Sequence, residues 1–172
     1  MRFLTLTLHP CIDRVIEVER WAPGGTFDGR LKLSVPSGKG VNTARSLRGL
    51  LGRKDRSKIY AAAWVGEGEA AWFERQLQLE DIAFSGMLRP CLTSTGTTLL
   101  EAGGRETHVK EAMTSPSGGE QMSMLQGCCD LPNTTIAAVC GSAPAKTSLG
   151  MLGIALALLR SQTKHLIADT HG

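Results

Sequence analysis

The stretch Ser37-Gly38-Lys39-Gly40-Val41-Asn42-Thr43-Ala44 joins a glycine-rich turn to the start of an amphipathic segment. Its two glycines allow the backbone to approach a ligand closely. The apolar residues that follow recur at helical spacing: Val41, Ala44, Leu47, Leu50 and Leu51. This spacing predicts a helix that begins at about Val41 and ends at Gly52. Its N-terminus would present free N–H groups to an anion, although a loop that only caps a helix can have the same spacing.

Two side chains give this turn its chemical character. The Lys39 ammonium suits a phosphate or a polyhydroxylated anion. The Asn42 amide both donates and accepts hydrogen bonds, which suits neighbouring sugar hydroxyls. The stretch matches neither the GxxxxGK[ST] loop nor the GxGxxG fingerprint of nucleotide-binding proteins.

Elsewhere in the chain, buried strands alternate with helices. Phe3–Leu8, Ile59–Val65 and Thr134–Cys140 are apolar runs of strand length, and segments 69–79 and 149–159 have helical patterns. This alternation predicts an α/β fold with a parallel sheet. Ligands bind such sheets at the carboxyl ends of the strands, where the sequence places Asp13, Gly66, Ser142 and Asp169.

A second kind of strand alternates between apolar and polar residues. Val15–Glu19 and Leu31–Val35 show this period of two, and Thr97–Ala102 with Thr107–Lys110 forms a predicted hairpin around Gly103-Gly104. Such strands have one face in water. We therefore expect them outside the main core.

The composition excludes several classes of protein. The 172 residues suit one domain or a piece of a larger protein, and 42% hydrophobic residues suffice for a core. A net charge of +3 is too even to predict nucleic-acid binding. Five cysteines without a CxxC pair or a His–Cys ligand spacing predict neither disulfides nor a metal site. Without a signal peptide or a membrane span, we expect a cytoplasmic protein.

Several blocks in order resemble the PfkB, or ribokinase-like, carbohydrate kinases. Ser37–Ala44 is similar to the family's GGKGxNxA motif, and Leu6–Arg14 to the TLNPAIDR opening of the 1-phosphofructokinase and tagatose-6-phosphate kinase branch. Four further blocks resemble the family's later motifs: Val65–Glu67, Arg105–Glu111, Val139–Pro144 and Ile167–Gly172.

The resemblance implies a ribokinase-like parallel sheet with flanking helices and a small β lid. Residues 1–172 would be the N-terminal, substrate-binding half of the kinase domain, truncated before its nucleotide-binding half. The lid would comprise strands at about 14–35 and 97–110. It could also mediate a homodimer.

The resemblance also implies a substrate site. Asp13 would accept hydrogen bonds from substrate hydroxyls, while Gly38, Lys39 and Asn42 would hold the sugar or its phosphate. Gly40 belongs to the same motif, and Ser142 would either contact substrate or only end a strand.

The sequence departs from the family pattern at two substrate-binding blocks. The branch carries an arginine in a TRxN block, where this chain reads Thr93-Ser94-Thr95-Gly96. Where the family has SGSLPPG, this chain has the segment Cys140–Lys146, which lacks one of the prolines and the final glycine. A basic residue elsewhere would have to replace the missing arginine, and the candidates are Arg89, Arg105 and Lys110.

The family's GAGD motif, with its anion hole and catalytic aspartate, is absent from the sequence. ATP and Mg²⁺ are implied by the family, but no residue of this chain is assigned to them, and none is assigned a catalytic role. The function predicted is that of a sugar-phosphate kinase present as its substrate-binding half and inactive alone. Fructose 1-phosphate is the first candidate substrate, followed by tagatose 6-phosphate and fructose 6-phosphate. The alternatives are a decayed, non-catalytic sugar-phosphate-binding protein and a Rossmann-type nucleotide-binding module.

Overall fold

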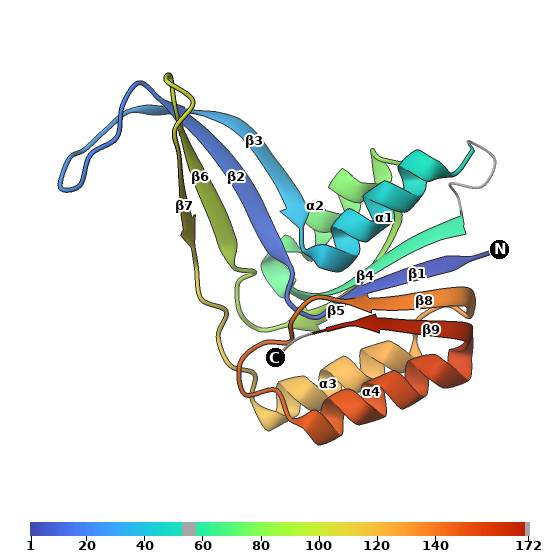
Figure 1. Ribbon diagram of the computed structural model, residues 1–172. Helices are drawn as coiled ribbons and strands as arrows, with labels where there is room; N and C mark the ends of the chain where they lie inside the picture. Colours follow the sequence, from blue (N-terminus) through green and yellow to red (C-terminus); the bar gives the residue numbers. More distant parts are fainter. Residues whose placement is uncertain (53–57, 171–172) are drawn as a thin grey trace.

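A five-stranded parallel sheet forms the centre of the molecule (Figure 1). The computed structural model describes residues 1–52 and 58–170. The sheet has the order β5-β4-β1-β8-β9. Its strands are β1 (Phe3–Thr7), β4 (Ile59–Gly66), β5 (Ala83–Arg89), β8 (Thr134–Cys140) and β9 (Thr163–Asp169). The apolar runs in the sequence correspond to the three strands in its middle.

Helices cover both faces of this sheet. Helices α1 (Lys39–Leu50) and α2 (Glu67–Gln78) lie on one face, and α3 (Gly118–Cys129) and α4 (Leu149–Gln162) lie on the other (Figure 1). The core is therefore divided in two by the sheet. The larger part lies under α3 and α4 and includes Trp64, Met124 and Leu159. The α/β class predicted from the sequence is confirmed.

A second, four-stranded sheet stands beside the carboxyl ends of the central strands (Figure 1). Its order is β3-β2-β6-β7, with β2 (Cys11–Val18), β3 (Gly29–Ser37), β6 (Thr95–Glu101) and β7 (Glu106–Lys110). The first pair follows β1 in the chain and the second follows β5. The alternating segments of the sequence thus pair with one another, outside the parallel sheet. We refer to these four strands as the lid sheet, a name taken only from the resemblance described above.

The structure corrects the sequence prediction at two elements. Helix α1 begins at Lys39 rather than at Val41, because Gly38 is the N-cap residue and ends the preceding strand with a φ of +124°. Strand β5 was not predicted, because Ser85 and Gly86 interrupt its apolar pattern. Several basic residues follow the glycine-rich turn in the sequence: Arg45 and Arg48 lie on α1, while Arg53, Lys54 and Arg56 lie outside the described residues.

No helix within residues 1–52 and 58–170 is long and apolar enough to cross a membrane.

Candidate functional site

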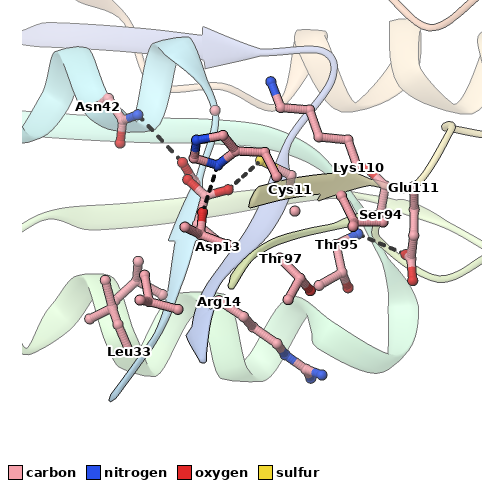
Figure 2. A pocket seen from close by; sticks show the side chains of 18 of the residues that line it. Cys11, Asp13, Arg14, Leu33, Asn42, Ser94, Thr95, Thr97, Lys110 and Glu111 are labelled. Atoms are coloured by element: carbon pink, nitrogen blue, oxygen red, sulfur yellow. Dashed lines mark hydrogen bonds between the residues drawn. The ribbon is translucent and has the colours of Figure 1, made fainter. Parts of the chain in front are cut away.

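A pocket of about 590 Å³ lies between the lid sheet and the N-terminus of α1. Four residues named from the sequence line it: Asp13, Gly38, Lys39 and Asn42. Asp13 is part of strand β2 rather than of a loop after β1, so its carboxylate is held on a paired strand. Figure 2 shows Asp13 and Asn42 on one side of the pocket and Lys110 and Glu111 on the other.

Two glycines allow α1 to begin directly against β1. A Cβ on Gly38 would lie 2.6 Å from the Thr7 methyl carbon, and Gly38 also has a positive φ that side chains rarely adopt. A Cβ on Gly40 would collide with the Thr7 hydroxyl and lie 2.9 Å from the Leu6 carbonyl. Gly40 is buried and does not line the pocket, so the structure gives it a packing role at this position.

The N-cap residue of α1, Gly38, has no side chain with which to cap the first turn. The Thr7 hydroxyl accepts a hydrogen bond from the Val41 N–H at 3.1 Å and so ties the helix to the end of β1. An uncapped N-terminus with glycines around it can receive an anionic or hydroxylated ligand.

Hydrogen bonds orient the Asn42 amide. Its oxygen accepts from Arg45 Nη1 at 3.0 Å, and its nitrogen donates to the Ser37 hydroxyl at 3.4 Å. Arg45 is itself held by Glu80, with 2.7 Å between Arg45 Nε and Glu80 Oε2. The amide is therefore positioned before any ligand binds.

Lys39 begins α1 at the carboxyl end of the parallel sheet. Strands β1 and β8 are neighbours there, and the helices α1 and α4 that come later in the chain lie on opposite faces of the sheet (Figure 1), the arrangement at which ligands bind open α/β sheets. The Lys39 ammonium lies 3.6 Å from the Asp169 carboxylate at the end of β9. Both side chains are at least half exposed, so this ion pair contributes little and a ligand anion can replace it.

The Cys11 thiol lies on the floor of the pocket beside Asp13. It donates to Asp13 Oδ1 at 3.4 Å. Burial, reinforced by the Asp13 charge, raises the pKa of Cys11 to about 11, so the thiol is protonated at neutral pH. Burial and the nearby Arg89 lower the pKa of His9, which keeps this pocket imidazole neutral at pH 7.

Ser142 and two of the three candidate basic residues lie outside the pocket. Arg89 is 1% exposed, stacks on Trp64 and pairs with Glu120 at 3.0 Å. Arg105 pairs with Glu101, with 2.7 Å between Nη2 and Oε2, at the far end of the lid sheet. Lys110 alone among the three lines the pocket.

The segment that departs from the family's TRxN block also contributes to the pocket. Ser94 is buried, lines the pocket and donates to the Pro10 carbonyl at 3.4 Å. Thr95, Gly96 and Thr97 follow it on β6 and line the same pocket. From the sequence, this segment was noted only for the arginine that it lacks. The polar run itself, just before a predicted strand, was the signal that it reaches the site.

The fold is similar to those of several solved structures. Phosphofructokinase-2 of Escherichia coli in complex with fructose-6-phosphate superposes with a TM-score of 0.80 at 20% identity, over 99% of this chain and 55% of that one. The same enzyme in complex with potassium gives a TM-score of 0.82 at 20% identity, over 99% and 54%. The fold is that of the ribokinase-like kinases.

A protein of Thermotoga maritima described as a possible 1-phosphofructokinase superposes with a TM-score of 0.73 at 16% identity, over 99% of this chain and 54% of that one. The chain therefore spans about half the length of these kinases. No protein-family model matches the sequence, and no curated protein sequence matches it significantly.

Proposed function

We propose that the pocket binds a phosphorylated sugar, as the substrate-binding half of a sugar-phosphate kinase does. The observation that carries this proposal is the convergence of a carboxylate, an oriented amide, an ammonium and an uncapped helix N-terminus in one pocket. Asp13 would accept from sugar hydroxyls, and Asn42 would both donate and accept. The Lys39 ammonium and the N–H groups of α1 would face the reacting end of the sugar.

The comparisons support the class of ligand. One of the similar structures is a phosphofructokinase in complex with fructose-6-phosphate. Fructose 1-phosphate remains the first candidate for this chain, with tagatose 6-phosphate and fructose 6-phosphate next. An association of two copies through the lid sheet also remains a prediction.

Phosphoryl transfer is not assigned to residues of this chain. Within residues 1–52 and 58–170, no group of three His, Cys, Asp or Glu side chains lies close enough to hold a metal ion. The two pocket carboxylates each have their own donor: Asp13 accepts from the Cys11 thiol, and Glu111 accepts from the Thr95 N–H at 2.8 Å. The described residues therefore provide no all-protein site for a metal ion.

Calorimetric titration of the three sugar phosphates tests the proposal. Asp13→Asn removes a charged acceptor and Lys39→Ala removes a charged donor, so each should weaken binding by about 1.5–3 kcal/mol, or roughly 10- to 150-fold. Lys164→Ala is the matched control, because Lys164 is exposed on β9 and does not line the pocket. Equal weakening by Lys164→Ala would show that binding is to a diffuse basic surface instead.

A further inference from the structure

One row of the lid sheet places a carboxylate and an ammonium on the same face. Asp13 on β2 pairs with Gly96 on β6, and Gly96 pairs with Lys110 on β7. Residues paired across strands direct their side chains to the same side of the sheet. Neighbouring strands lie about 4.8 Å apart, so the Asp13 and Lys110 backbones are separated by roughly 10 Å. Both residues line the pocket.

Gly96 leaves the space between them empty. A Cβ at this position would lie 3.0 Å from Asp13 Oδ1, closer than side chains ordinarily approach. Any larger residue would fill the gap and press on the carboxylate. Glycine inside a strand often marks a place where a ligand approaches the backbone. In the next row, the Thr98 hydroxyl is hydrogen-bonded to His108 Nδ1 at 2.9 Å, which fixes one wall of the gap.

The charge of Lys110 is available to a ligand. Within the part of the chain that the structure describes, no carboxylate forms an ion pair with the Lys110 ammonium. The adjacent Glu111 carboxylate is occupied by the Thr95 N–H. The Lys110 charge is felt at Cys11 in the pocket. It lowers the pKa of the Cys11 thiol, although burial raises that pKa by more. Lys39, by contrast, lies 3.6 Å from the exposed Asp169 carboxylate, a weak ion pair that a ligand would have to displace.

We propose that Lys110 is the anion-binding residue of this pocket and that Gly96 sets its distance from Asp13. The inference rests on the proposed function and deepens it. The preferred ligand then carries its phosphate at one end, on Lys110, and presents hydroxyls at the other end to Asp13. The Lys110 ammonium, on β7, would then take the role of the arginine that the Thr93–Gly96 segment lacks. A sugar of the same length without the phosphate would lose the contact with Lys110.

The test is calorimetric titration of fructose 1-phosphate, fructose 6-phosphate and tagatose 6-phosphate. Lys110→Met should weaken the best ligand by roughly 10- to 100-fold, and Lys110→Arg should restore most of the affinity because it restores the charge. Gly96→Val should weaken binding by blocking the gap, with Gly96→Ala intermediate. Lys164→Met removes the same charge far from the pocket and should change nothing. Thermal melts of each variant verify that the fold is retained.

The outcomes separate the two proposals. If Asp13→Asn weakens binding while Lys110→Met does not, the pocket binds sugar phosphates but Lys110 is not its anion-binding residue. If Lys110→Arg fails to restore affinity in a folded protein, the charge is not what the ligand recognises, and the inference is overturned. If none of the three sugar phosphates binds the unmodified chain, both the proposed function and this inference are wrong.

Discussion

Gly40 has no room for a side chain, and the loss of stability on adding one can be measured. Gly40→Ala would force a methyl group against the Thr7 hydroxyl and the Leu6 backbone, neither of which can move away without disturbing β1. Overpacking of this kind costs about 1–3 kcal/mol. We expect a loss of that size in the free energy of unfolding, measured by urea denaturation.

Gly49 supplies the matched control. It lies on the same helix, is exposed, and has no atom within 4 Å of an added Cβ. Gly49→Ala should therefore stabilise the protein by about 0.5–1 kcal/mol, since alanine favours the helix. If both substitutions had the same sign, the close contact of α1 with β1 would not be the cause.

The sequence was sufficient to bring together some site residues but not others. Asp13, Lys39 and Asn42 could be placed at one rim because each lies near the end of a predicted strand or the start of a predicted helix. Arg89 could not be excluded beforehand, because its burial under Trp64 depends on β5, a strand the sequence pattern did not reveal. Lys110 could be named as a candidate, but only the parallel pairing of β2 with β6 places it in the same row as Asp13.

At the scale of elements, the start of α3 is stabilised by charge. The Ser117 hydroxyl accepts from the Glu120 N–H at 3.2 Å, and Glu120 accepts from the Ser117 N–H at 2.8 Å, which forms a capping box. Glu120 also pairs with the buried Arg89 at 3.0 Å. The hydrogen bond from the Ser117 backbone, followed by the Ser117 side chain and Arg89, holds the pKa of Glu120 below its usual value.

A lowered carboxyl pKa fixes the direction of a pH effect. The stabilisation is complete above the pKa of Glu120 in the unfolded chain, near 4.5, and is lost as pH falls through the lower folded value. At pH 7, Glu120→Gln should therefore reduce the free energy of unfolding by about 1.5–3 kcal/mol. The difference from the unmodified protein should shrink as the pH is lowered below about 4.5, as urea denaturation at several pH values will show. A difference that does not change with pH would mean that the charge of Glu120 contributes nothing.

Element boundaries were predicted where the chain uses residues with a strong local preference. The hairpin of β6 and β7 was recognised from Gly103-Gly104, and its strands lie where expected. The start of α1 was misplaced by two residues because a glycine N-cap leaves no polar side chain to mark it. The pairing of β2 with β6 is parallel and connects distant segments, so no local pattern indicates it.

At the scale of the whole molecule, β9 has a neighbour on one side only in the described sheet. Ile167 on this strand is 56% exposed, and Leu149 on the adjacent α4 is 84% exposed. An unpaired strand edge with an exposed isoleucine can pair with other chains. We expect the polypeptide of residues 1–172 to self-associate with rising concentration, in analytical ultracentrifugation.

Single substitutions distinguish this edge from the lid sheet. Ile167→Lys places a charge on the edge strand and should shift the equilibrium toward monomer. Leu31→Lys changes an exposed leucine on β3 of the lid sheet and should leave that association unchanged. The reverse result would assign the association to the lid sheet, as the resemblance to dimeric kinases of this fold implied.

The central position of β1 also has a consequence for the order of events during synthesis. The strand is made first, yet its partner β8 follows it by about 130 residues. At roughly 5–20 residues per second, the ribosome needs on the order of 10 s to supply that partner. Until β8 is made, β1 can pair only with β4 in the parallel sheet, and its other edge stays unpaired. The middle of the sheet is begun early and finished late, so translation speed sets how long this edge of β1 stays unpaired.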